Sequence, residues 1–204
     1  MSGKIYDISP AVATDLAVYP GDLPYSSHSA TDSGVMVSDI HTTLHIGAHV
    51  DAPLHCMANA ASIDQVEPSY FVGSCQVIKL RLKPKYKLTP SDFKDIAITE
   101  KRILIATGTF EPTKWSDDYA AFHPECIDFF HTKGVFLIGI DTPSVDPAAA
   151  HHLPAHKRMA EQGIIGLENL YLNEVEQGYY LLIALPLKLR GLEASPVRAI
   201  LTEV

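Results

Sequence analysis

The segment HIGAHVDAPLH, residues 45–55, constrains the local fold most strongly. Gly47 and Pro53 argue against a continuous helix, because glycine costs about 1 kcal/mol and proline about 3 kcal/mol in a helix interior. In an extended chain successive side chains point to opposite faces, and here the apolar residues occupy the even positions. Pro53 cannot donate to a neighbouring strand, so we expect the strand to end there or to lie at an edge. The residues that share the polar face are His45, Gly47, His49, Asp51 and, just beyond the strand, His55.

This polar face is either solvated or a metal site. Solvated strand faces usually carry Lys, Glu, Thr and Ser, whereas imidazole and carboxylate groups are the usual ligands of zinc and similar divalent ions. A glycine between two histidines would also leave room for an ion. Three histidines in register with Asp51 therefore favour a metal site, and a carboxylate between histidines can bridge two ions.

A two-metal site needs further ligands from elsewhere in the chain. His156 lies on a predicted helix, and Glu168 follows the apolar run 164–167, where a strand end would present it. Glu168 is equally well explained as a surface charge. We expect His151 and His152 to lie on an exposed helix surface.

The rest of the chain alternates apolar, β-branched runs with helical signals, which predicts an α/β or mixed α+β fold rather than a simple doubly wound sheet. The segment Ala11–Gly34 has little periodicity and reads as a long loop. Helices are expected from Thr89-Pro90, from His123-Pro124-Glu125 to near Gly134, and over Ala148–Gln162, with Gly163 as the stop. The expected strands are Lys4–Ile8, Cys75–Leu82, Arg102–Ala106, Val135–Ile140, Tyr179–Leu189 and Val197–Glu203.

Composition restricts the class of partner and the compartment. The 204 residues carry a net charge of −8 and no run of Lys or Arg, which argues against nucleic acid or an anionic membrane as a partner. No apolar stretch reaches the roughly 20 residues of a membrane span, and Met1–Tyr6 lacks the pattern of a secretory leader. The three cysteines, Cys56, Cys75 and Cys126, form no CxxC pair, so we expect a cytoplasmic protein whose metal ligands are nitrogen and oxygen atoms. From the length we expect a single domain, 1–204.

The segment 45–55 resembles the signature of the metal-dependent cyclase-like hydrolases, of which the bacterial kynurenine formamidases are the best-known branch. Further stretches match the same branch in the same order, so the resemblance spans most of the chain. These stretches are Asp7-Ile8-Ser9-Pro10, Tyr19-Pro20-Gly21-Asp22, Gly139-Ile140-Asp141-Thr142-Pro143-Ser144-Val145-Asp146-Pro147, and Leu153-Pro154-Ala155-His156 continuing to Glu168.

The resemblance implies a compact α/β fold built around a mixed, barrel-like sheet with flanking helices, of the cyclase-like, swivelling β/β/α type, assembled as a dimer or higher oligomer. It also implies two zinc ions per subunit. His45, His49 and Asp51 would hold one ion. Asp51 would bridge to the second, completed by His156 and Glu168, and Glu168 would contact both. Manganese or cobalt also suits such ligands.

The implied reaction is hydrolysis of N-formyl-L-kynurenine to L-kynurenine and formate, a step of tryptophan breakdown. His55 would be the catalytic acid or base, because its ordinary pKa lies near neutrality. Tyr19 would bind the aromatic part of the substrate. The chain has no Gly-x-Ser-x-Gly elbow, the usual marker of a serine hydrolase.

Some positions depart from the branch pattern, which has Trp in place of Tyr19, Thr in place of Ile46 and an aromatic residue in place of Cys56. These departures leave open a related hydrolase that opens a cyclic amide or lactone such as isatin. A metal-binding protein without catalysis is the alternative of a different class. Asp141, Ser144 and Asp146 are expected to orient the ligand histidines, although a turn after the preceding strand explains Asp146 equally well.

Overall fold

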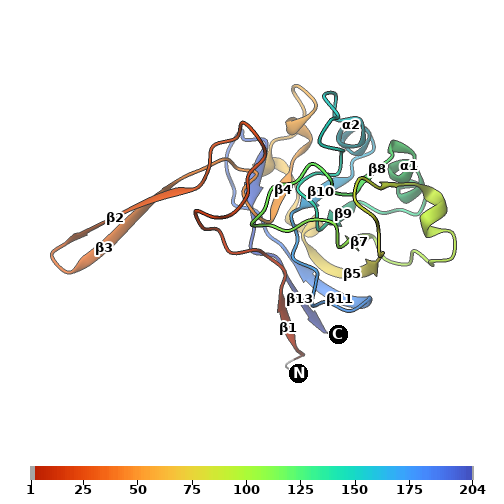
Figure 1. Cartoon of the computed structure of the whole chain (residues 1–204), viewed down its shortest axis with the longest axis horizontal. Helices are drawn as coiled ribbons and strands as arrows, with labels where there is room; N and C mark the ends of the chain where they lie inside the picture. The colour runs from red at the N-terminus through yellow and green to blue at the C-terminus, as the bar shows by residue number, and fades with distance from the viewer. Residues whose placement is uncertain (1–2, 204) are drawn as a thin grey trace.

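The computed structural model describes residues 3–203. The prediction that Met1–Tyr6 is not a secretory leader therefore lies in part outside the described residues. Nine strands form one mixed sheet that curls into a half-barrel (Figure 1). The pairs β5–β7, β7–β9 and β9–β10 are parallel, and the other pairs are antiparallel. In sheet order the strands are β1 (Ile5–Asp7), β13 (Ile200–Glu203), β11 (Gly178–Ile183), β5 (Val72–Lys79), β7 (Arg102–Ala106), β9 (Leu137–Ile140), β10 (Ile165–Glu168), β4 (His49–Asp51) and β12 (Ala194–Pro196).

The continuous apolar runs of the central strands reflect burial on both faces. Alternate residues of β7 and β9 enter two different cores. Leu104 and Leu137 belong to the core inside the curl, together with residues of β4 and β11. Ile103 and Ile138 belong to the second core, beneath the helices. The prediction of a mixed, barrel-like α/β fold is confirmed.

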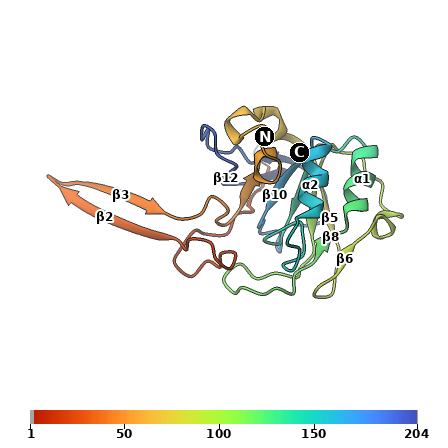
Figure 2. The same cartoon turned by 90° about the horizontal axis from the view of Figure 1, so that it is seen from above.

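Two α-helices, α1 (Pro124–Thr132) and α2 (Pro154–Glu161), cover one side of the sheet (Figures 1 and 2). The expected helix over Ala148–Gln162 is wrong in its first part. Leu153 adopts a left-handed conformation (φ 45°), and the following proline disfavours a right-handed helical conformation for it, so the helix begins only at Pro154. No helix within residues 3–203 is long and apolar enough to cross a membrane. The minor elements are the 3₁₀ helices η1 (Pro53–His55), η2 (Ile63–Gln65), η3 (Pro68–Tyr70) and η4 (Pro90–Phe93), and the short parallel pair β6 (Lys87–Leu88) and β8 (Ala121–Phe122).

The long loop expected over Ala11–Gly34 is also wrong in part. From Ser26 the chain forms β2 (Ser26–Asp32), which pairs with β3 (Val35–His41) in a hairpin that projects far from the body (Figures 1 and 2). The turn residues Ser33 and Gly34 both have positive φ, as a type I′ hairpin turn requires. Every residue of both strands is exposed.

The segment 45–55 is extended only at its centre. Strand β4 spans three residues, between β10 and β12, and ends before Pro53 as predicted. Gly47 has φ +57°, and a Cβ there would meet Leu16 and Val12 at 3.4 Å. The glycine therefore serves a turn beneath the N-terminal loop, and the interpretation that it makes room for an ion is wrong.

Candidate metal centre and active site

Four neighbouring elements bring together the side chains expected to bind metal. His49 and Asp51 lie on the same face of β4, and the antiparallel register places Glu168, at the end of β10, opposite His49. His156 lies in the first turn of α2, which packs against β10. The turn before β4 supplies His45. The predicted helix position of His156 and strand-end position of Glu168 are both confirmed.

Asp51 is the centre of this cluster. Its Oδ1 lies 3.0 Å from Nδ1 of His45, and its Oδ2 lies 3.2 Å from Nε2 of His156. Glu168 links the other sides, with Oε1 at 3.1 Å from Nε2 of His156 and Oε2 at 3.3 Å from Nε2 of His49. Each carboxylate thus faces two histidines, as a bridging ligand would.

Contacts behind the cluster fix the orientation of two of its rings. Nδ1 of His49 lies 2.9 Å from the carbonyl oxygen of Gly47 and must donate to it, so the neutral ring presents the lone pair of Nε2 to the cluster. Nδ1 of His156 likewise donates to Asp146, at 2.7 Å. The fully buried Asp146 also accepts the backbone amides of Ala155 and His156, which caps α2. Such contacts behind a ligand fix its tautomer and direction.

The cluster concentrates negative charge that needs a cation. Asp51 and Glu168 are both buried, and burying an unpaired carboxylate is costly. Burial opposes the charged form of His45, but contacts with Asp51 and the charges of Glu168 and Glu193 outweigh it and raise the pKa of His45 to about 9. Burial likewise opposes ionisation of Asp51, but the surrounding histidines hold its pKa well below the usual value.

Two atoms of the cluster lack hydrogen bonds, which supports a metal ion there. Nε2 of His49 and Oδ1 of Asp51 are buried and make no hydrogen bond to any residue within 3–203. The structure holds two sets of candidate ligand atoms, and within each set all the atoms lie within 4.8 Å of one another. One set comes from His45, Asp51 and His55, and the other from His49, Asp51 and Glu168. Nitrogen and oxygen donors in these positions fit zinc or a similar divalent ion.

A cavity of about 500 Å³ opens over the cluster. His55, at the end of η1, lies in it, with its ring centroid 4.5 Å from that of His45 and 5.3 Å from that of His156. Burial lowers the pKa of His55 below its ordinary value, so the ring is neutral at pH 7. A neutral imidazole beside the cluster can accept a proton.

Tyr19 lies at the mouth of this cavity and is 41% exposed. Its hydroxyl donates to the carbonyl oxygen of Ala148 at 3.1 Å. Its ring packs against that of Trp115 in an edge-to-face contact, with the two ring centroids 5.2 Å apart. Sequence reasoning missed Trp115, although it is the single tryptophan of the chain. Trp115 therefore supports the ring of Tyr19 and is not itself among the residues that line the cavity.

Other positions singled out from the sequence fall in different places. Ile46 is 1% exposed in the core and does not line the cavity, whereas Cys56 adjoins a small pocket behind His55. His151 and His152 are exposed as expected, but they lie in the turn before α2, and His151 lines the cavity mouth. Sequence reasoning also missed other polar lining residues, namely Asp22, Thr43, Asn169 and Glu193.

Of the residues expected to orient ligands, Asp146 contacts a ligand histidine directly. Asp141 instead accepts the amides of Thr107 and Gly108 and the hydroxyl of Thr107, away from the cluster. Ser144 lines the cavity and its hydroxyl accepts the amide of Asp146. Asp141 therefore has a structural role at the end of β7, and none of these hydrogen bonds joins it to a histidine of the cluster.

Comparisons with known proteins agree with this geometry. Residues 6–147 match the family described as "Putative cyclase". The chain is 42% identical over 205 residues to the kynurenine formamidase of Delftia acidovorans, covering 98% of each chain. It is also 42% identical to the kynurenine formamidase of Bordetella pertussis, covering 98% of this chain and 99% of that one. A solved structure of a predicted metal-dependent hydrolase from Bacillus stearothermophilus superposes with a TM-score of 0.85 at 28% identity, covering 98% of both. The chain therefore belongs to the cyclase family, in the branch of the bacterial kynurenine formamidases.

Proposed function

We propose that this protein is a metal-dependent hydrolase that converts N-formyl-L-kynurenine to L-kynurenine and formate. The observation that carries the proposal is the buried cluster of three histidines and two carboxylates beneath a cavity that also holds His55. Support comes from relatives over the whole chain that are named kynurenine formamidases.

In this proposal His45, His49 and Asp51 hold one zinc ion, and Asp51, His156 and Glu168 hold a second. A bound zinc ion lowers the pKa of coordinated water toward 7 and polarises a carbonyl oxygen. Manganese or cobalt would suit the same donors. The residues themselves fix the donor atoms before any ion binds, because β4, β10 and α2 are all anchored in the sheet or against it.

His55 is proposed as the acid and base of the reaction. Its neutral ring accepts a proton from the attacking water as the oxygen bonds to the formyl carbon. The ring then returns the proton to the departing aniline nitrogen as the C–N bond breaks, which yields formate and the free amine. General acid–base catalysis of this kind contributes about 10²–10⁴-fold to a rate.

The aryl ring of the substrate is proposed to lie against Tyr19 at the cavity mouth. Tyr19 offers less area than a tryptophan, but Trp115 packs against its ring in an edge-to-face contact and so supports its position. Offset or edge-to-face contacts between aromatic rings are worth about 0.5–1.5 kcal/mol beyond area burial.

We propose further that the protein acts as a homo-oligomer, with the β2–β3 hairpin as its contact. A lone two-stranded hairpin is marginally stable in water, and this one carries apolar side chains on both faces, which predicts a covering partner. The apolar side chains are Val35, Met36, Val37 and Ile40, each at least 64% exposed.

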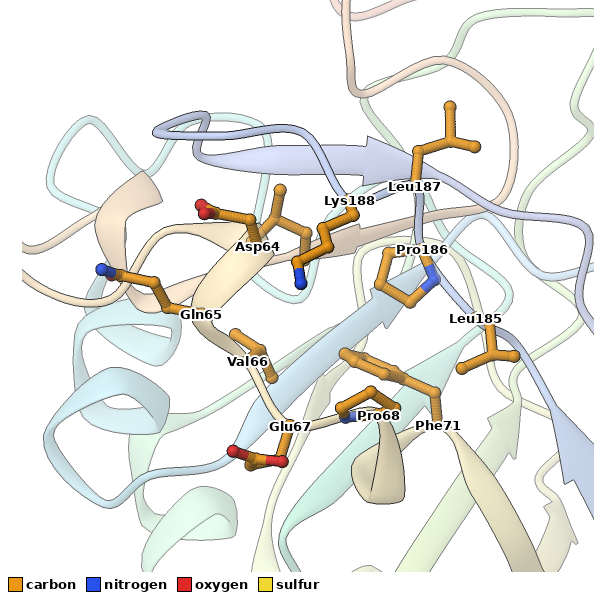
Figure 3. A pocket seen from close by; sticks show the side chains of 11 residues that line it. Asp64, Gln65, Val66, Glu67, Pro68, Phe71, Leu185, Pro186, Leu187 and Lys188 are labelled. Carbon is orange, nitrogen blue, oxygen red and sulfur yellow. The ribbon is translucent and has the colours of Figure 1, made fainter.

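A groove of about 240 Å³ offers a second apolar surface (Figure 3). Val66, Pro68 and Phe71 line one side of it, and Leu185 and Pro186 line the other (Figure 3). Leu185 belongs to the apolar run Tyr179–Leu189, just beyond the end of β11. Two apolar surfaces on one chain allow copies of that chain to cover each other.

The proposed function is tested by a substrate panel with wild-type protein and His55→Ala. The wild type should hydrolyse N-formyl-L-kynurenine, and His55→Ala should lose at least 10²-fold in kcat while retaining its metal. Full activity in a folded, metal-loaded His55→Ala would refute the role of His55, and metal loss would assign it as a ligand instead. Faster opening of isatin would favour the cyclic-amide alternative, and no turnover from zinc-loaded protein would favour a metal-binding protein without catalysis.

A further inference from the structure

The mouth of the active-site cavity carries two carboxylates and, among the described lining residues, no Lys or Arg. The carboxylates are those of Asp22 and Glu193. A cavity built to accept a free carboxylate would ordinarily present Arg or Lys. This mouth is suited to a cation instead.

Backbone hydrogen bonds place both residues at the mouth, and a side-chain hydrogen bond orients the carboxylate of Asp22. The carbonyl oxygen of Glu193 accepts the amide of Ala52 at 2.8 Å, which fixes Glu193 where β12 begins beside β4. Asp22 donates its own amide to the carbonyl oxygen of Tyr19 at 2.9 Å, and its Oδ2 accepts the Thr43 hydroxyl at 3.1 Å. Preorganised acceptors bind a ligand without first having to be ordered.

Glu193 has acceptor capacity to spare. Its Oε1 lies 3.6 Å from Nε2 of His45, which is beyond hydrogen-bond distance, and its side chain is 39% exposed in the cavity. Glu193 also lies outside both groups of candidate metal ligands found within residues 3–203. Its carboxylate is therefore available to a molecule bound above the cluster.

On the basis of the proposed function, we infer that Glu193, assisted by Asp22, binds the α-ammonium group of the substrate and makes the enzyme selective for amine-bearing aryl formamides. With the formamide over the metal cluster and the ring against Tyr19, the amino-acid end of the substrate points to the mouth, where these carboxylates lie. The α-carboxylate of the substrate then meets no Lys or Arg among the described lining residues, so it should contribute less to selectivity than the amine.

The test compares three substrates by kcat/KM with zinc-loaded protein. These are N-formyl-L-kynurenine, its analogue without the α-amino group, and its analogue without the α-carboxylate. Loss of the amine should lower kcat/KM at least tenfold, mainly through KM, and loss of the carboxylate should lower it less. The preference for the amine-bearing substrate should fall about tenfold in Glu193→Gln. It should be retained in the charge-matched control Glu174→Gln, an exposed carboxylate that does not line the cavity.

The outcomes separate the two proposals. Equal turnover with and without the amine, or a selectivity ratio that Glu193→Gln leaves intact, would overturn the role of Glu193 while the formamidase function stands. Loss of zinc from Glu193→Gln would make it a metal ligand and would also overturn this inference. Failure to hydrolyse all three formamides would overturn the proposed function and the inference with it.

Discussion

Asp146→Asn tests whether the contact behind His156 tunes metal binding. Asp146 accepts Ala155 N at 2.8 Å, His156 N at 3.0 Å and His156 Nδ1 at 2.7 Å, and it is fully buried. An asparagine keeps one acceptor oxygen and turns an NH₂ group toward a remaining donor. One buried donor is then unpaired, at about 1–3 kcal/mol, and the bond to His156 loses its charge. We expect a loss of about 2–3 kcal/mol in the free energy of unfolding of the metal-free protein.

The same substitution should weaken zinc binding by 10–100-fold, because residues behind a metal ligand have effects of that size. Competition with a chromophoric chelator measures the zinc affinity, and urea denaturation measures stability. Asp141→Asn is the matched control, since Asp141 also accepts two backbone amides and one side chain but lies away from the cluster. It should lose stability and retain zinc affinity. Unchanged zinc affinity in Asp146→Asn, or an equal loss in both variants, would refute the reasoning.

Three further predictions concern packing, thiols and assembly. A Cβ on Gly139 would clash with a methyl group of Leu104, so Gly139→Ala should lower the free energy of unfolding, measured with denaturant, by about 1–3 kcal/mol. Gly166→Ala, whose Cβ meets only Met159 at 3.5 Å, should lower it less. Equal losses in the two variants would contradict this. Burial raises the pKa of the Cys75 thiol to about 12, so at pH 8 a thiol reagent should modify half-buried Cys56 first and Cys75 only after unfolding. Peptide mapping identifies the labelled cysteine, and labelling of Cys75 in the folded protein would refute this. Replacing the β2–β3 hairpin by a short Gly-Ser turn should yield a monomer in light scattering, and an unchanged mass would exclude the hairpin as the contact.

The strands were predicted correctly from the sequence where their residues are buried on both faces of the sheet. Strand β7 matches the predicted Arg102–Ala106, because the four residues after Arg102 are apolar and buried on both faces. Predicted Tyr179–Leu189 ends early as β11, since Pro186 cannot donate to a ladder. The hairpin was not predicted because β2 is polar and no residue of either strand is buried, so no alternation of buried and exposed positions marks the two strands.

The candidate site was foreseeable in its ligands and less so in its surroundings. Period-two spacing grouped His49 with Asp51 because both lie on one face of β4. His45 reaches the same cluster from a turn, which the alternation does not describe. Glu193 and Trp115 come from distant segments, and only the three-dimensional fold shows that Glu193 lines the cavity and that Trp115 packs against Tyr19.

The most direct test of the account is hydrolysis of N-formyl-L-kynurenine by purified protein, followed as released kynurenine, before chelation, after chelation and after return of zinc. The account predicts turnover that the chelator abolishes and that zinc, at two ions per subunit, restores. Turnover that survives complete removal of metal would contradict the central claim that the cluster around Asp51 is a catalytic metal centre. So would a folded, zinc-loaded protein with no turnover.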